Sequence, residues 1–264
     1  ADGAEPARTA LFLTPPESSR GHPCYEHVAP RDLLQQIIET AGLKLHPRSR
    51  ALDGGAAAGL ASLRHAGDLL AGGEVRHVLI AGVDSLVNPH DIGRLLAANR
   101  LMNDDNPKGF VPGEGAAAVC LTQRAGKAGR GCTILATGSA TETDTAATDR
   151  FSQGRAMLAA LKEAAGGGEP EVDFVLSNVN GERYAFWEAT LAHARFYRTR
   201  RERLPTVYPA MTVGDIGAAG AALSLVIARD AFETGYAPGK IAMAEIASES
   251  GLRSAAILRG ESGG

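Results

Sequence analysis

The stretch Ala51-Leu-Asp-Gly-Gly-Ala-Ala-Ala-Gly59 decides the fold of this chain. Its small residues are typical of a turn that joins a strand to a helix and aims backbone amides of the helix N-terminus at a substrate's carbonyl oxygen. In enzymes such a turn carries a nucleophilic side chain at its bend. No Cys, Ser or Thr lies between Ala51 and Gly59. The stretch therefore predicts a nucleophile turn that lacks its nucleophile.

Four further segments follow this turn in the chain. They are Val78-Leu-Ile-Ala-Gly-Val83, Gly109-Phe-Val-Pro-Gly-Glu-Gly-Ala116, Asn178-Val-Asn-Gly181 and Met211-Thr-Val-Gly-Asp-Ile-Gly-Ala-Ala-Gly220. In this order and at these intervals, the segments resemble the β-ketoacyl synthase branch of the thiolase-like superfamily, whose members condense acyl groups with a Cys-His-His site. The segment from Gly109 is the most specific match. The resemblance runs from about Ala51 to the last expected strand and is weak before it.

Carried over position by position, the resemblance leaves none of the family's catalytic side chains in place. The family's cysteine falls on Ala56, or on Ala57 if the alignment shifts by one residue. Its first histidine falls on Asn180, its second on Gly214, and the lysine before the second histidine on Pro209. Condensation needs a thiolate to hold the acyl group and imidazoles to stabilise the developing negative charge. The resemblance therefore implies a catalytically degenerate member.

Three carboxylates lie close in sequence to these positions: Asp53, Glu182 and Asp215. One of them acting as a general base would give a hydrolase. In the other interpretation they cap helices or face solvent, because Asp readily serves as an N-cap. We favour the second interpretation.

No cofactor or metal site is expected. His22, Cys24, Glu26 and His27 are metal-ligating residue types, but their spacing matches no regular zinc pattern. The glycine-rich run from Gly54 fits neither a dinucleotide fingerprint nor a phosphate loop, so it predicts close helix packing instead.

Composition narrows the class of protein. The 264 residues are 44% hydrophobic, and 27 Lys and Arg nearly balance 30 Asp and Glu, which argues against a nucleic-acid partner. No apolar run approaches the ~20 residues that span a bilayer, and the N-terminus lacks the apolar core of a signal peptide. Three scattered cysteines make no disulfide framework. These features predict a cytoplasmic protein without a membrane partner.

Alternating strands and helices predict an α/β protein of two similar halves, 1–122 and 123–264, packed as one compact domain. The second half reads βαβαβαββ and the first βαβαββ, so the first half lacks its leading βα unit. Right-handed crossovers imply parallel-rich sheets. Two such halves with helices between them form the layered αβαβα sandwich that the thiolase-like resemblance implies.

The expected elements follow from apolar periodicity and from Gly and Pro punctuation. In the first half we expect strands 10–14, 50–53, 77–81 and 116–121 and helices 31–41 and 57–70. In the second we expect strands 133–137, 174–178, 206–208, 241–247 and 255–259 and helices 155–165, 185–200 and 216–231. The helices from Ala57 and Ile216 should pack closely through alanine and glycine, both fully buried.

The missing βα unit has two explanations. The chain could be a fragment of a protein that continues upstream, which we favour. A natural deletion would instead leave a central sheet position empty and apolar neighbours exposed.

Two classes of function compete. The preferred class is a non-catalytic scaffold, adaptor or dimer partner. Relatives of two kinds fit it: chain-length partners of type II polyketide ketosynthases, and inactive thiolase-like proteins that accompany type VI secretion cargo genes. The rival is an acyl-thioester-processing enzyme with an atypical site, namely an acyltransferase, a hydrolase or a 3-oxoacyl-ACP synthase.

Assembly follows from the strand expected before the turn. In thiolase-like proteins this strand pairs across a two-fold axis, so a homodimer or a related ketosynthase-like subunit is expected. Pro47, Arg48 and Arg50 weaken that edge. The arginine-rich run 195–203 is either the basic end of a helix or a docking patch for an acidic partner such as an acyl carrier protein. Protein cargo is a further candidate partner.

Overall fold

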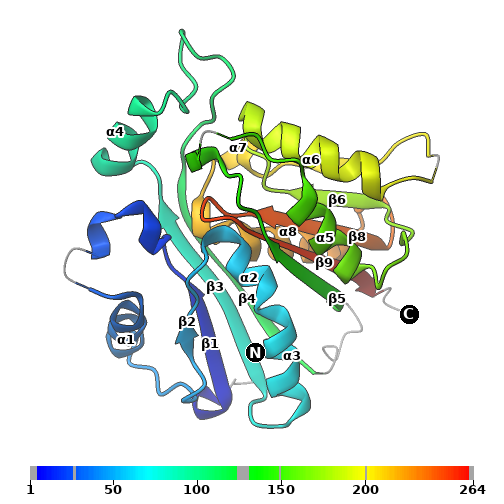
Figure 1. Ribbon diagram of the computed structural model, residues 1–264. Helices are drawn as coiled ribbons and strands as arrows, with labels where there is room; N and C mark the ends of the chain where they lie inside the picture. The colour runs from blue at the N-terminus through cyan, green and yellow to red at the C-terminus, as the bar shows by residue number, and fades with distance from the viewer. Residues whose placement is uncertain (1–4, 26–27, 124–130, 149, 200, 262–264) are drawn as a thin grey trace.

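The computed structural model describes residues 5–25, 28–123, 131–148, 150–199 and 201–261. Two mixed β-sheets form the framework, with helices between them and on their outer faces (Figure 1). Helix α8 (Gly220–Thr234) contacts strands of both sheets and lies between them. Helix α1 (Pro30–Thr40) packs on the outer face of the first sheet, and α5 (Arg155–Ala164) on that of the second.

The first sheet has the strand order β2-β1-β3-β4. Strand β1 is parallel to both of its neighbours, β2 and β3, and β4 runs antiparallel to β3. The strands are β1 (Thr9–Thr14), β2 (Arg50–Ala51), β3 (His77–Ser85) and β4 (Glu114–Thr122).

The second sheet has the order β5-β9-β8-β6-β7. Strand β6 is parallel to β7 and β8, whereas β9 is antiparallel to both of its neighbours. The strands are β5 (Gly131–Thr141), β6 (Phe174–Ser177), β7 (Thr206–Val207), β8 (Ile241–Ala247) and β9 (Leu252–Glu261).

The strands β2-β1-β3-β4 of the first sheet match β7-β6-β8-β9 of the second. The two sets have the same spatial order relative to their order in the chain, and the same strand directions. Strand β5 is the additional member, and it lies at the edge beside β9. A matching strand in the first sheet would therefore lie at the edge beside β4. The strand order therefore favours an edge position for a leading strand over the central position that we expected.

The expected helices and strands are present with shifted ends, and β8 has the expected bounds. The remaining helices are α2 (Ala58–Ala61), α3 (Leu63–Ala71), α4 (Pro89–Ala97), α6 (Arg183–Phe196) and α7 (Ala210–Val213). Short 3₁₀ turns are η1 (Pro6–Arg8), η2 (Ser18–Arg20), η3 (Pro23–Tyr25), η4 (Gly55–Ala57), η5 (Ala146–Thr148) and η6 (Gly217–Ala219).

Two expectations about helices were wrong. Helix α4 was not predicted, although Asn88 caps it by accepting a hydrogen bond from the Asp91 amide and Pro89 opens its first turn. The helix expected over 57–70 is interrupted at Ser62, whose hydroxyl donates to the backbone oxygen of Gly59.

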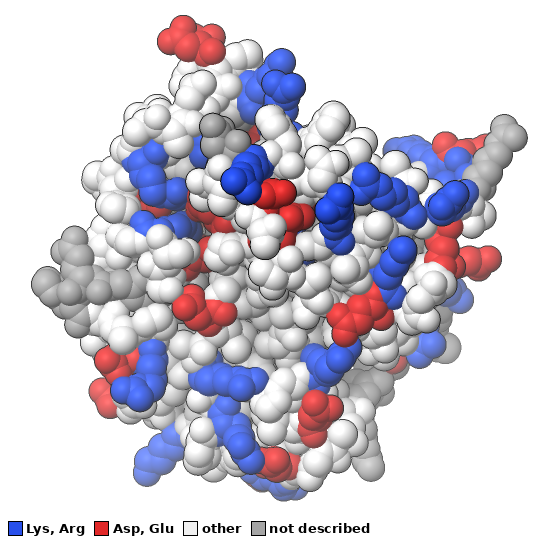
Figure 2. Space-filling view, in the orientation of Figure 1, with Lys and Arg blue, Asp and Glu red and all other residues white. Residues whose placement is uncertain are grey.

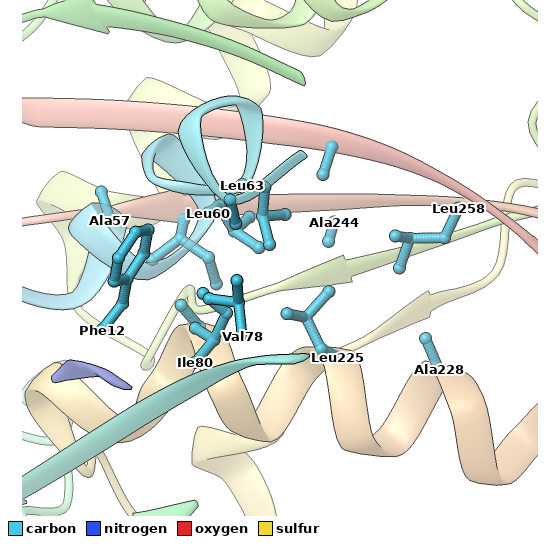
Figure 3. Packing of buried hydrophobic residues seen from close by; sticks show 14 of the residues in the cluster. Phe12, Ala57, Leu60, Leu63, Val78, Ile80, Leu225, Ala228, Ala244 and Leu258 are labelled. Carbon is cyan, nitrogen blue, oxygen red and sulfur yellow. The ribbon is translucent and has the colours of Figure 1, made fainter. Parts of the chain in front are cut away.

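The central helices meet as closely as their small residues allow. A Cβ added at Gly59 would lie 2.7 Å from the Cβ of Ala221, so glycine is required for this approach. Leu60 and Leu225 extend the contact into an apolar core between the sheets (Figure 3).

The expectation that both central helices are fully buried is wrong. Arg64 and Asp68 of α3 and Arg229 of α8 face solvent. Polar residues recur on one face of each helix, while the opposite face stays in the core as far as Leu70 of α3 and Ala228 of α8.

Gly55→Ala should lower the free energy of unfolding by about 2–4 kcal/mol. Gly55 has φ 64°, and a Cβ there would lie 1.8 Å from Oε1 of Glu17. Gly67→Ala is the matched control: it lies within α3 with nothing within 4 Å of the added Cβ, and should raise stability by about 0.5–1 kcal/mol. Denaturant unfolding measures both changes. Equal effects would contradict the packing of Glu17 on this turn.

Candidate functional site

Loops that follow the carboxyl ends of β1, β3, β6 and β8 line one cavity of about 100 Å³ between the two halves of the chain. This is where ligands bind in open α/β sheets. A groove of about 370 Å³ adjoins it and shares with it Arg100, Ala146, Glu182 and Tyr184. Figure 2 shows Asp and Glu side chains in the hollowed middle of one face, with Lys and Arg around them.

The structure brings together four of the seven residues that the sequence singled out. Ala56, Asn180, Glu182 and Asp215 line the cavity. The other three, Asp53, Pro209 and Gly214, are not among its lining residues. Asp53 is exposed and accepts a hydrogen bond from the Ser18 hydroxyl at 2.9 Å.

Buried ion pairs begin at Arg20, which follows β1. Its two terminal nitrogens each donate to one carboxylate oxygen of Asp84 at 2.8 Å, and Nη2 also lies 3.3 Å from Oδ2 of Asp91. Arg94 of α4 contacts the other oxygen of Asp91 at 3.2 Å and Oε1 of Glu249 at 2.8 Å. Two arginines thus connect β3 and α4 to the loop after β8.

Arg100 extends these ion pairs to the second half. It donates to Glu249 and, through Nε and Nη2, to the two oxygens of Glu182 at 2.7 and 2.8 Å. Asn180 lies 3.5 Å from Glu182 and donates to Oδ2 of Asp215 at 2.7 Å.

Two consecutive backbone amides close the chain of contacts into a ring. The amide of Gly217 donates to Asp215 and that of Ala218 to Asp84, both at 2.9 Å. Both amides lie at the start of the helical segment that continues into α8, where backbone N–H groups favour anions. We call this closed set the buried ion ring; its members are Arg20, Asp84, Asp91, Arg94, Arg100, Asn180, Glu182, Asp215 and Glu249.

Burial and the neighbouring charges shift the pKa values of three acidic members of the ring. Burial alone would raise the pKa of Glu249, but Arg100 and Arg94 lower it below its usual value. Burial opposes ionisation of Asp91 as well, but Asn88, Arg20 and Arg94 hold its pKa low. The pKa of Asp215 is raised, because burial outweighs its hydrogen bonds from Asn180 and the Gly217 amide.

Glu17 lies beside the ring and ties two loops together. Its carboxylate accepts the amides of Glu249 at 3.0 Å and Ser250 at 2.8 Å, and it packs against Gly55. Burial, with a smaller contribution from Glu249, raises its pKa.

The turn before α2 is satisfied internally. Gly54 and Gly55 adopt φ of 132° and 64°, whereas Ala56 does not have a positive φ. The Ala57 amide donates to the Ser248 hydroxyl at 2.7 Å, and that hydroxyl donates to the backbone oxygen of Gly54 at 2.6 Å. One amide that could face a substrate oxygen is therefore already occupied.

Gly214 has little room for a side chain. Its φ is 76°, and a Cβ there would lie 3.0 Å from the backbone oxygen of Pro112. A histidine at this position would be strained by both the backbone conformation and the contact.

The sequence did not reveal the arginines and most of the acids of this site. Arg20, Asp91, Arg94 and Glu249 were not identified as site residues, and Glu17 was not either. The available signal was a set of single charged residues shortly after expected strands, where the loops of an α/β sheet converge.

The sequence also led to expectations about a metal site and about membrane-spanning helices. His22 Nδ1 and Cys24 Sγ lie 2.8 Å apart, while Glu26 and His27 fall outside the described residues. Across the part of the chain that the structure describes, no three His, Cys, Asp or Glu side chains gather as metal ligands would. None of the helices in that part has the length and apolar character needed to cross a bilayer.

The sequence matches one family model. Residues 38–126 match the β-ketoacyl synthase N-terminal domain. A search of curated proteins gave no significant match.

Solved structures share the fold at low identity. A chain from a type II PKS acyl-carrier protein in complex with its ketosynthase gives a TM-score of 0.76 at 16% identity, with 97% of this chain and 78% of that chain covered. The ishigamide ketosynthase/chain length factor gives 0.69 at 18% identity, covering 99% and 75%.

A third match is the ketosynthase from module 6 of the bacillaene synthase of Bacillus subtilis 168, with a TM-score of 0.74 at 16% identity; 97% of this chain and 53% of that chain are covered. This chain therefore spans about half of the bacillaene ketosynthase. The fold of this chain is that of the ketosynthases, with two mixed sheets flanked by helices.

Arg100→Met should lower the free energy of unfolding by about 3–5 kcal/mol, because it leaves Glu182 and Glu249 buried without this cation. Arg229→Met is the control: it removes an exposed pair with Glu233 one turn along α8 and should cost at most about 0.5 kcal/mol. Denaturant unfolding of both variants checks this. A loss at Arg100 no larger than at Arg229 would contradict the structural role of the ring.

Proposed function

We propose that this chain is a non-catalytic ketosynthase-like protein that acts as a scaffold, adaptor or dimer partner. The buried ion ring is the observation that carries the proposal. It lines the cavity between the halves with paired charges, and Ala56 and Asn180, to which the resemblance assigns the positions of the family's cysteine and first histidine, line the same cavity.

The possible replacement bases are poorly placed for chemistry. A general base must take a proton from the substrate, and hydrogen bonds donated to a carboxylate make it a weaker base. Glu182 accepts two hydrogen bonds from Arg100, and both oxygens of Asp215 accept hydrogen bonds from Asn180 and Gly217. Asp53 is exposed and does not line the cavity. This supports a role that needs the fold but not the reaction.

We also infer that the halves 1–122 and 123–264 derive from one duplicated βαβαβαββ unit and form the αβαβα sandwich. The correspondence of β2-β1-β3-β4 with β7-β6-β8-β9 supports this. Superposition of the two sets of strands would test it.

A partner is part of the proposal. Two of the structurally similar proteins are a type II PKS acyl-carrier protein in complex with its ketosynthase and a ketosynthase/chain length factor. We propose a homodimer or a related ketosynthase-like subunit, in the cytoplasm, with an acyl carrier protein or protein cargo as further candidates. An association with type VI secretion rests on the resemblance alone.

The alternative function is an acyl-thioester-processing enzyme with an atypical site. Asp215 favours it, because burial raises the pKa of this carboxyl and it lies beside Asn180 in the cavity. A carboxyl whose pKa is raised by burial is a candidate for proton transfer.

Incubation with acyl and malonyl thioesters separates these functions. Mass spectrometry should show neither a covalent adduct nor turnover for the unmodified chain. Thioester loss that Asp215→Asn or Glu182→Gln abolishes, and that the exposed variant Asp68→Asn leaves unchanged, would establish the enzyme instead.

Restoring the thiol with Ala56→Cys should not create a condensing enzyme, because Asn180 and Gly214 supply no imidazole. Adding Gly214→His should lower stability by about 1–3 kcal/mol through its positive φ. Condensation assays and denaturant unfolding check the two outcomes. Measurable condensation by Ala56→Cys alone would refute the loss of catalysis at several positions.

Light scattering should show a dimer that pairs through the free edge of β2. Leu52 donates its amide to Leu13, so the preceding amide, that of Ala51, faces the open edge. Ala51→Pro removes that donor and should weaken the dimer, while circular dichroism verifies the fold. A stable monomer with Arg50 and Leu52 open to solvent would contradict the proposed assembly.

A further inference from the structure

We infer that the cavity between the two halves binds a small organic cation through its ammonium N–H groups, at the carboxylates of Glu188 on α6 and Glu245 on β8. These two residues lie outside the buried ion ring and have no part in the family's chemistry as carried over above. The inference does not depend on whether the chain is catalytic.

The charge of the cavity favours a cation. Its lining contains more acids than bases, with a formal excess of three negative charges, and buried charges are normally paired or hold cations. Each lining arginine already donates to at least one carboxylate. The seven acids are Glu17, Asp84, Glu182, Glu188, Asp215, Glu245 and Glu249, and the four bases are Arg20, Arg94, Arg100 and Arg253.

Glu245 has one oxygen available for a ligand. Its side chain is almost fully buried, at 1% exposed, and Oε2 pairs with Nε2 of His193 at 2.7 Å. Oε1 has no hydrogen-bond partner among the described residues. Because Glu245 lines the cavity and His193 does not, the unpaired oxygen is the one left for a donor from the cavity.

Glu188, on α6, has a similar arrangement. It is 2% exposed, and Oε2 accepts from Nε of Arg253 at 2.9 Å. Oε1 has no hydrogen-bond partner within the described ranges. The nearby Ser152 hydroxyl favours the charged form of Glu188, but its single proton is donated to Glu142 at 2.7 Å. Burial raises the pKa of Glu188, as expected for a carboxylate without enough donors.

The chemistry selects an ammonium group. Both free atoms are carboxylate oxygens, which accept hydrogen bonds when ionised, and an ammonium supplies three donors with a positive charge. A volume of about 100 Å³ admits a ligand of a few heavy atoms. Divalent cations need more oxygen ligands than the described side chains gather at one place. The adjoining groove that shares Arg100 and Tyr184 offers an entry route.

Methylammonium and putrescine are the probes, with tetramethylammonium as a control of equal charge that has no N–H donor. Calorimetric titration should show binding of at least one of the two amines. The same amine, at about ten times its Kd, should raise Tm by roughly 3–5 °C. Tetramethylammonium should do neither. If neither amine binds at 10 mM, which is on the order of the weakest Kd that we would count as a binding site, the inference is overturned. Equal binding of tetramethylammonium would also overturn it.

Glu245→Gln and Glu188→Gln should each weaken amine binding about 10- to 100-fold, since each removes a charged acceptor. Glu163→Gln, which changes an exposed carboxylate on α5 by the same atoms, should bind as the unmodified chain does. If Glu188→Gln fails to fold because Arg253 loses its partner, Glu245→Gln still decides. Unchanged binding in Glu245→Gln would place the amine elsewhere and refute the site.

Discussion

Arg100 contacts carboxylates from two segments that are far apart in the sequence, Glu182 after β6 and Glu249 after β8. Its own backbone follows α4, so one guanidinium joins three loops. Arg20 and Arg94 continue the connection to Asp84 and Asp91. Buried ion pairs contribute little net stability relative to apolar packing, but an unpaired member is costly. The loops around the cavity are therefore held in the one arrangement that keeps every member of the ring paired.

This constraint accounts for the cavity's chemistry. An acyl-transfer site keeps a nucleophile and proton donors free to meet substrate. Here the carboxylates near Ala56 are engaged: Glu17 by two amides, Asp215 by Asn180 and Gly217, and Glu182 by Arg100. Within the described part of the chain, Oε1 of Glu188 and Oε1 of Glu245, elsewhere in the lining, have no hydrogen-bond partner. The cavity therefore suits a partner that supplies donors.

Close backbone packing between the two halves positions part of the buried ion ring. Gly59 approaches Ala221, and a Cβ at Gly82 would lie 2.3 Å from the backbone oxygen of Ala218. These contacts place the amides of Gly217 and Ala218 where Asp215 and Asp84 accept from them. The small residues at these contacts are thus required for the hydrogen bonds to Asp215 and Asp84 as well as for the packing of the core.

The sequence by itself determined the alternation of strands and helices, the close contact of the Ala and Gly segments and the resemblance to ketosynthases. Periodicity and punctuation are local, and the apolar run of β8 gave its bounds directly. Asn88 and Pro89 carried the signal for α4 as well, although it was not used. From the resemblance, the sequence also predicted that Ala56, Asn180 and Gly214 occupy the positions of the family's cysteine and two histidines.

Only the tertiary structure decided which charges meet. Arg20 and Asp84 are 64 positions apart and Arg94 and Glu249 are 155 apart, so no local pattern relates them. It also decided that Asp53 lies outside the cavity while Asp215 lines it. The physical reason is that ion pairing and strand order depend on how the halves pack, and packing is set by contacts between segments distant in the chain.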